Sequence, residues 1–347
     1  MRLSARRLNR TLLRRQHLLE RVDLTVEEMS RHLVGLQAQE NLSPFLSLHA
    51  RLDPFDPLDV TRGLDDRSLV RLLVMRGTVH LLAADDIGLR TWTTPVHERE
   101  VRASRVIGPA REVDRDAFLA ALHEVLGDGP LPQRAIGEAL TVRFPGATAT
   151  QLGQLARCTA PLVQLPPRGT WRGSGGVVHD LADRWTGASL EAPDPADVVR
   201  RYLRAFGPAS AADVTAWSGV TRLGPVVAAM DDLVHHEDDD GRPLVDVADG
   251  VLEDDDSPAP VRLLGTYDNV WLSHARRDRV TPPGSREAWS GPNGGSACTL
   301  FADGWLVGLW RAVDGRVQVV ETLRDLTPRE RSGLDDEISR VEALLAR

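Results

Sequence analysis

Residues 69–82, LVRLLVMRGTVHLL, are apolar and rich in β-branched side chains, and they predict the two strands of a β-hairpin. Helical leucine spacing and a capping box of Thr25 and Glu28 predict helices upstream, with Asn41 and Pro44 ending the second. The expected helices cover residues 4–21, 26–36 and 56–63. Three helices followed by a hairpin is the element order of a winged helix.

The same order recurs twice farther along the chain. The second set has expected helices over residues 115–127, 132–140 and 148–159, and strands over 162–165 and 176–181 around the glycine-rich loop 168–176. The third has expected helices over residues 195–206, 210–217 and 221–235, then a turn at 239–241 and a strand over 244–247. Alternating residues in 261–271 and 298–322 and a helix from Thr327-Pro328 predict a small β structure with a closing helix.

The expected fold class is therefore α+β, with tandem winged-helix motifs and a small C-terminal β structure. Its expected parts are residues 1–110, 111–190, 191–257 and 258–347.

Composition restricts the function classes. Of the 347 residues, 42% are hydrophobic and 27% charged, and no apolar run approaches the roughly 20 residues that cross a bilayer. No apolar segment follows the N-terminal arginines, so we expect a cytoplasmic protein without a secretory signal. Cys158 and Cys298 are isolated thiols, and His235 and His236 would point to opposite faces of a strand, so we expect neither a metal site nor a cofactor.

All 42 basic residues are arginine, and the chain contains no lysine. This excludes a Walker A loop, a protein-kinase site, a pyridoxal Schiff base and a lysine-nucleophile lyase. If the protein cleaves a glycosidic bond, we expect water to be the nucleophile.

The net charge of −8 comes from one segment. Residues 231–256 hold 12 acidic residues and one arginine, whereas the remaining chain has a balance of +3. Residues 1–21 contain seven arginines and one acid. This asymmetry suits either a protein with one DNA-facing side or an ordinary solvated basic helix.

Several separated segments resemble the AlkZ and YcaQ group of bacterial winged-helix DNA glycosylases. They are RHLVGLQAQENLSP (31–44), MRGTVHL (75–81), RGTW (168–171), YDNVWL (267–272) and FADGWLVGLWR (301–311). The resemblance implies a C-shaped arrangement of tandem winged helices that binds double-stranded DNA as a monomer. It further implies excision of N-alkylated (N7 or N3) purines and, in some members, unhooking of interstrand crosslinks.

The family's catalytic glutamine, apolar residue, glutamine motif falls on Gln37-Ala38-Gln39. An N7-alkylated guanine is already cationic, so its glycosidic bond breaks without a strong general acid. Two amides that donate and accept hydrogen bonds can hold the attacking water. Without the resemblance, two glutamines satisfying the backbone at a helix end would be the simpler interpretation.

DNA contacts are expected from a second group of residues. Strand alternation would place Arg76, Thr78 and His80 on one face, although a lone histidine is more often structural. Arginines would bind the phosphate backbone. The candidates are Arg6, Arg7, Arg10, Arg14 and Arg311, the last in a C-terminal hairpin that the resemblance implies probes the duplex.

Two other function classes stay open at this point. One is a non-catalytic winged-helix DNA-binding or regulatory protein, because winged helices are more often binders than enzymes. The other is an interaction scaffold whose acidic segment binds partners. The motif at Gln37-Ala38-Gln39 favours the enzyme over the first, and the charge balance outside the acidic segment disfavours the second.

Overall fold

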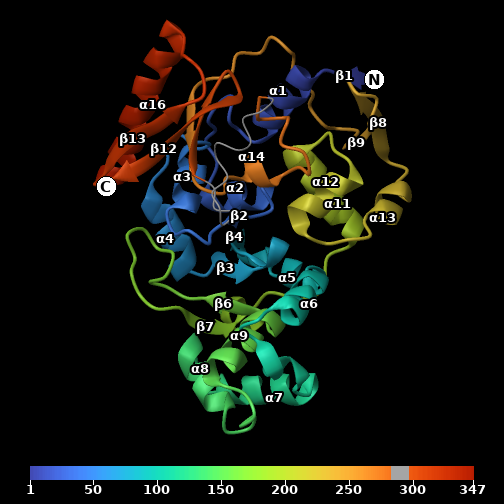
Figure 1. Ribbon diagram of the computed structural model, residues 1–347, viewed down its shortest axis with the longest axis vertical. Coiled ribbons are helices and arrows are strands. Elements are labelled where there is room, and N and C mark those ends of the chain that lie inside the picture. Colours follow the sequence, from blue (N-terminus) through green and yellow to red (C-terminus); the bar gives the residue numbers. More distant parts are fainter. Residues whose placement is uncertain (283–296) are drawn as a thin grey trace. The chain divides into compact units, whose positions relative to one another are not determined.

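The computed structural model describes residues 1–282 and 297–347, and it groups them into two compact units (Figure 1). Unit 1 combines Met1–Pro57, Pro195–Trp217 and Thr221–Arg347, and unit 2 combines Leu58–Asp194 and Ser218–Val220. Residues 283–296 of the expected C-terminal part lie outside the described residues. The division into four consecutive parts stays a prediction.

Unit 2 contains the expected hairpin. Strands β3 (Leu69–Leu73) and β4 (Val79–Ala83) are antiparallel, with Leu69 opposite Ala83 and Leu73 opposite Val79. Between them Met75–Gly77 forms a short 3-10 turn, η1, in which Arg76 has a φ of 54°. Arg76 therefore does not lie on the strand as expected, because the chain is already turning there. Helix α4 (Pro57–Asp65) precedes the hairpin as expected.

The second half of unit 2 follows its expected element order. Its elements are α7 (Arg115–Val125), β5 (Leu131–Pro132), α8 (Gln133–Leu140), α9 (Ala149–Thr159), β6 (Leu162–Gln164), β7 (Val178–Leu181) and α10 (Ala182–Thr186). The sheet places the strands of this unit in the order β4-β3-β6-β7-β5. A side-chain cluster that includes Phe118, Leu122, Ile136 and Leu152 forms the core beneath them.

Local sequence explains the close pairing of α8 and α9. Thr148 and Gln151 form a capping box that begins α9. Gly137 of α8 lies so close to α9 that a Cβ there would sit 2.0 Å from the Ala149 carbonyl oxygen. Only glycine allows this approach of the two backbones. Between β4 and α7 the chain forms η2 (Ala84–Asp86), α5 (Leu89–Trp92), α6 (Thr94–Ala103) and η3 (Gly108–Glu112), which the sequence patterns did not predict.

The N-terminal helices of unit 1 are shorter than expected. Helix α1 (Ala5–Arg15) is capped by Ser4 and ends well before residue 21. Helix α2 (Val26–His32) begins with the expected capping box, but Val34 and Gly35 have φ values of 53° and 93° and end it early. Strand β2 (Leu36–Gln37) follows. Pro44 lies in the first turn of a further helix, α3 (Ser43–His49), where the sequence predicted only a helix end.

The acidic segment is partly folded into unit 1. Helices α11 (Pro195–Phe206) and α12 (Ala211–Ser218) match the expectation. The helix expected over residues 221–235 is wrong, because α13 spans only Gly224–Ala228 and buries none of its side chains. Strand β8 (Leu233–Asp238) begins instead, and it pairs with β9 (Pro243–Val247) and in parallel with β1 (Arg2–Leu3). Pairing on both sides outweighs the weak helical preference of this segment.

The C-terminal part of unit 1 is the expected small β structure. Its antiparallel strands β10 (Arg262–Leu264), β11 (Cys298–Ala302), β12 (Trp305–Val313) and β13 (Arg316–Thr322) lie in sequence order. Positive φ values at Asp303-Gly304 and Asp314-Gly315 make the two tight turns. Helix α14 (Asn269–Leu272) lies between β10 and β11, and α16 (Pro328–Ala346) closes the chain.

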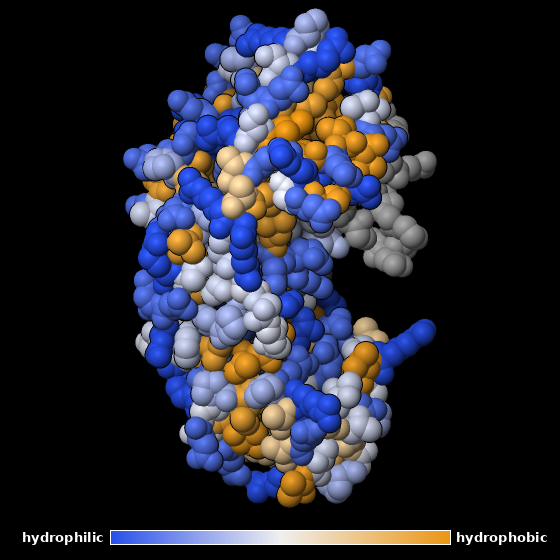
Figure 2. Space-filling model, turned by 90° about the vertical axis from the view of Figure 1, so that its left-hand side faces the viewer, coloured by the Kyte–Doolittle hydropathy of each residue, from blue (hydrophilic) through white to orange (hydrophobic). Residues whose placement is uncertain are grey.

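Strand β13 is an edge strand with exposed apolar side chains. Val319 and Val320 are exposed, and Figure 2 shows apolar side chains gathered among hydrophilic ones over the region of β13 and α16. Arg316 and Glu321 are charged residues on the same strand, and such charges discourage edge-to-edge pairing. Among the described residues, no helix combines the length and apolar character needed to cross a membrane.

Candidate active site

The motif Gln37-Ala38-Gln39 follows a constrained turn of unit 1. The Gly35 amide donates to the Ser30 carbonyl oxygen at 2.8 Å, which closes the end of α2. Val34 occupies the left-handed region, which is costly for a β-branched residue and is sustained only by the surrounding structure. The turn directs the chain into β2, and the backbone position of Gln37, the first residue of the motif, is thereby fixed.

The two glutamines have different environments. Gln37 is 6% exposed, whereas Gln39 is exposed and lies beyond the end of β2. The side-chain oxygen Oε1 of Gln37 is buried and has no hydrogen-bond partner among the described residues. An unpaired buried acceptor costs about 1–3 kcal/mol, so its retention needs an explanation. The pair offers one buried acceptor and one accessible amide.

A segment distant in sequence supports this turn. Asn269, at the start of α14, donates from Nδ2 to the Gly35 carbonyl oxygen at 2.9 Å. Asp268 caps the same helix by accepting from the Val270 amide at 3.2 Å. Both side chains are buried. The YDNVWL segment therefore contacts the backbone that precedes Gln37.

Asp268 is itself held by a buried ion pair. Arg51 donates to both of its carboxylate oxygens at 2.8 Å, and the Ser47 hydroxyl donates to Oδ2 at 2.8 Å. The Arg51 and Asp268 side chains are both 0% exposed. A bidentate pair without solvent access fixes both partners, and removing one would leave an uncompensated buried charge. Helix α14 is thereby anchored to α3 and the residues that follow it.

Thr78 and His80, expected on a DNA-facing surface, lie in unit 2. His80 is 2% exposed, and its Nδ1 pairs with the Thr78 carbonyl oxygen at 3.0 Å. Burial, together with the charge of Arg76, lowers the pKa of His80 to about 3. The Thr78 hydroxyl donates to the Met75 carbonyl oxygen. His80 is thus a neutral internal residue, whereas Arg76 and Thr78 are half-buried at the turn.

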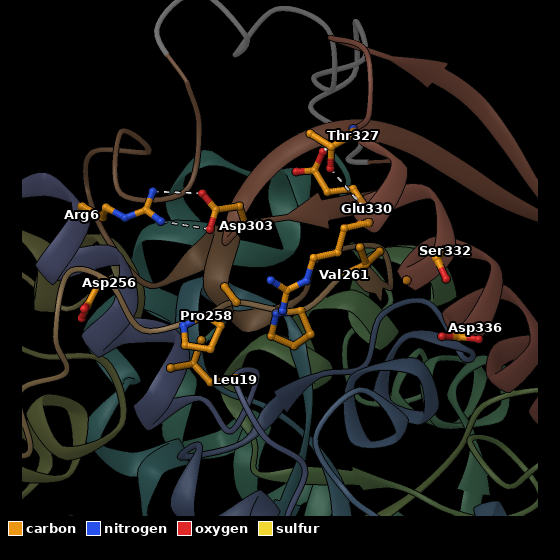
Figure 3. Close-up of a pocket in the computed structure, with 14 residues that line it drawn as sticks. Arg6, Leu19, Asp256, Pro258, Val261, Asp303, Thr327, Glu330, Ser332 and Asp336 are labelled. Carbon is orange, nitrogen blue, oxygen red and sulfur yellow. Dashed lines mark hydrogen bonds and ion pairs between the residues drawn. The ribbon is translucent and has the colours of Figure 1, made fainter.

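The N-terminal arginines are largely engaged inside unit 1. Figure 3 shows Arg6 directed at Asp303, with hydrogen bonds of 2.9 and 3.1 Å to its carboxylate. Arg10 is fully buried and also bonds Asp303, with Nε donating to the Ser257 carbonyl oxygen. Arg7 and Arg14 lie within 4 Å of Asp254 and Glu253. The basic helix and part of the acidic segment therefore neutralise each other, so the charge asymmetry along the sequence does not mark two separate faces.

A cavity of about 990 Å³ adjoins this ion-pair group. Arg6, Asp303, Pro258 and Glu330 are among its lining residues, and Figure 3 shows the Thr327–Glu330 contact at its edge. Neither Gln37 nor Gln39 lines it.

Arg311 has a different setting. It is exposed on β12 and donates to Gln318 Oε1 of β13 at 3.1 and 3.2 Å, and within residues 1–282 and 297–347 no carboxylate forms an ion pair with it. Its charge is available to an outside anion. Among the described residues, no group of three or more His, Cys, Asp or Glu side chains is arranged to hold a metal ion.

Asp268, Asn269 and Arg51 support the turn before Gln37, but no sequence pattern assigned them a role. Their separation from Gln37 along the chain hides the contact. The only sequence feature that indicates burial of Asp268 and Asn269 is that apolar side chains accompany them in residues 267–272.

Comparison with known proteins agrees with the resemblance. Residues 30–344 match the family described as DNA glycosylase AlkZ-like. The interstrand DNA cross-link repair glycosylase of Streptomyces sahachiroi is 27% identical over 335 residues, covering 88% of this chain and 87% of the relative. The solved structure of Streptomyces sahachiroi DNA glycosylase AlkZ has the same fold, with a TM-score of 0.80 at 21% identity over 100% of this chain and 98% of that one. The chain belongs to the family of AlkZ-like DNA glycosylases, enzymes that act on N-glycosyl bonds.

Proposed function

We propose that this chain is a monofunctional glycosylase that excises N7- or N3-alkylated purines from double-stranded DNA, with water held by Gln37 and Gln39. The observation that carries the proposal is the buried Gln37 Oε1, which has no hydrogen-bond partner in the described part of the chain, close to the exposed Gln39. The Gln37 oxygen can accept a hydrogen bond from a water molecule, and the Gln39 amide can hold the same water in its orientation for attack.

The chemistry suits two neutral amides. Water attacks C1′ of the sugar, the C1′–N9 bond breaks, and the cationic base leaves with the bonding electron pair as a neutral purine. The proton released by the water passes to solvent. Because alkylation has already made the leaving group labile, weak bases suffice, and we expect selectivity for cationic lesions. The absence of lysine supports water as the nucleophile.

We also propose that the enzyme unhooks interstrand crosslinks, since the relative from Streptomyces sahachiroi is named for that repair. Among the proposed phosphate contacts are Arg311 in unit 1 and, independently, the turn residues Arg76 and Thr78 in unit 2. Arg7 and Arg14 belong to the same proposal, because the carboxylates of Asp254 and Glu253 lie 3.8 and 3.9 Å from them, beyond hydrogen-bond distance. Arg6, Arg10 and His80 are omitted, because their polar atoms are already engaged within the protein.

The winged-helix interpretation of the fold is a proposal as well. It is supported in unit 2 by the three helices α7, α8 and α9, which are followed by the paired strands β6 and β7. The monomeric state and the cytoplasmic location belong to the same proposal.

The test is base excision from duplexes that contain N7-methylguanine or a nitrogen-mustard crosslink, followed by alkaline cleavage at abasic sites. Under single-turnover conditions, Gln37→Ala and Gln39→Ala are each expected to lower the rate constant by about 10- to 100-fold, because the water loses its orientation. Gln154→Ala in unit 2 is the matched glutamine control and should retain the original rate. No excision by the native protein above that of the Gln37→Ala and Gln39→Ala variants, with DNA binding intact, would identify a non-catalytic DNA-binding protein. A measurable rate that is equal in all variants would overturn the role of the two glutamines.

A further inference from the structure

The backbone immediately before Gln37 is held by a side chain from another part of unit 1. Gly35 and Gln37 are two residues apart, and the Gly35 carbonyl oxygen accepts from Asn269 Nδ2 at 2.9 Å. Asn269 is 6% exposed, so solvent does not compete effectively for this contact. The Asn269 amide group is therefore one of the contacts that fix the direction of the Gly35 carbonyl.

The turn would not hold this geometry by local preference alone. Val34 and Gly35 both have positive φ values, and the valine is a β-branched residue in a region that such side chains rarely adopt. A strained turn persists when its surroundings over-determine it. Asn269 supplies that constraint from one side, while the Gly35 amide bonds the Ser30 carbonyl oxygen from the other.

Asn269 is itself rigidly placed. It is the first residue of α14, whose capping residue Asp268 is held by Arg51 and Ser47. Because that ion pair is fully buried, α14 has little freedom to follow a displaced turn. The chain of contacts runs from Arg51 through Asp268 and Asn269 to the peptide beside Gln37.

We infer that Asn269 is a positioning residue for the glycosylase reaction: its bond to the Gly35 carbonyl oxygen fixes the turn that aims the buried Gln37 amide at the attacking water. This inference rests on the proposed role of Gln37. Asn269 does not touch the substrate in this account, and it acts only through the backbone of the turn. A displacement of about 1 Å in a positioning group is enough to cost roughly 100-fold in rate.

The first test is a double-mutant cycle in single-turnover excision of N7-methylguanine by the full chain. Asn269→Ala and the isosteric Asn269→Asp, which removes the donor, are expected to lower the rate constant about 10-fold in the native background. In the Gln37→Ala background the same changes should have less than about a 2-fold effect, because the group they orient is gone. DNA affinity should be unchanged in every variant.

Asn9 is the matched control. It is another fully buried asparagine of unit 1, and its Nδ2 donates to the carbonyl oxygens of Arg279 and Gly304. Asn9→Ala should change the rate by the same factor in both backgrounds, as a purely structural defect does. An equal loss from Asn269→Ala in both backgrounds would overturn the inference.

A second measurement does not depend on activity. Amide hydrogen exchange of the peptide covering residues 33–39 should accelerate in Asn269→Ala and Asn269→Asp, and should not change in Asn9→Ala. Unchanged exchange in the Asn269 variants would refute the positioning role. If exchange accelerates while Gln37→Ala retains full activity, the proposed function of Gln37 fails although the contact with the turn stands.

Discussion

At the scale of single residues, neutral and unpaired groups define the candidate site. Gln37 presents a buried acceptor without a partner among the described residues, and neither glutamine of the motif carries a charge. The histidine predicted near the DNA surface, His80, is buried and neutral. His80 therefore contributes to the stability of the fold, and the pH dependence of the unfolding free energy measures this contribution.

We predict that stability falls in acid partly because of His80. Its folded pKa, about 3, lies below the unfolded value of 6.5, so below pH 6.5 the unfolded chain binds a proton that the folded protein does not. The contribution is present above pH 6.5 and is lost as the pH falls toward 3. Lowering the pH from 7 to 5 should therefore reduce the unfolding free energy by about 2 kcal/mol through the protonation of His80 in the unfolded chain.

The measurement is urea denaturation of the native protein and of His80→Phe across that pH range. The unfolding free energy of His80→Phe should decrease less than that of the native protein as the pH falls. His123→Phe, which changes an exposed histidine in the same way, is the control. Identical pH slopes for native protein and His80→Phe would contradict the prediction. Other buried histidines, such as His97 with a pKa near 3, keep part of the slope in either case.

At the scale of elements, helix ends in this chain are set by short polar signals. Thr25–Glu28, Thr148–Gln151 and Thr327–Glu330 all form reciprocal capping boxes. Their helix starts were predictable because both partners are three residues apart. Helix lengths were less predictable, since α1 and α2 end where positive-φ residues and tertiary contacts turn the chain.

Removal of a cap in α16 should weaken unit 1. The Thr327 hydroxyl accepts from the Glu330 amide at 3.2 Å, and the Glu330 carboxylate accepts from the Thr327 amide at 2.8 Å. Thr327→Ala is expected to lower the unfolding free energy by about 1 kcal/mol, whereas Thr327→Ser retains the acceptor and most of the stability. Equal unfolding midpoints in urea for the two variants would show that the cap is not what stabilises this helix start.

At the scale of the whole molecule, net charge is a poor guide to the DNA-binding surface. The seven arginines of residues 1–21 suggested such a surface, but Arg6 and Arg10 bond Asp303 and Arg15 bonds Asp246. Charges already paired within the fold release few counterions on binding DNA. Arg311, which donates to the neutral Gln318, is the better candidate.

Salt dependence can separate these two kinds of arginine. Arg311→Ala should reduce the slope of log Kd against log salt concentration by about 1, as expected for the loss of one phosphate contact. Arg6→Ala should change it much less, because its charge is matched by Asp303. Fluorescence anisotropy with an undamaged duplex provides the slopes. An equal reduction for both variants would place Arg6 on the DNA surface after all.

The sequence by itself determined the features that depend on neighbours along the chain. A continuous apolar, β-branched stretch specified the β3–β4 hairpin, capping pairs specified helix starts, and the glutamine motif with its flanking segments identified the family. These signals are local because β-branched runs and helix capping involve residues only a few positions apart.

Only the tertiary structure decided which distant groups meet. Asn269 bonds Gly35 across 234 positions, and Asp268 pairs with Arg51 across 217, distances at which no periodicity or spacing rule applies. The same reason explains why residues 233–238 form a strand rather than a helix, since their partners are β9 and the N-terminal β1. Burial and partner choice depend on the path of the entire chain, and they bring Arg10, an expected DNA contact, into a buried position where it pairs with Asp303.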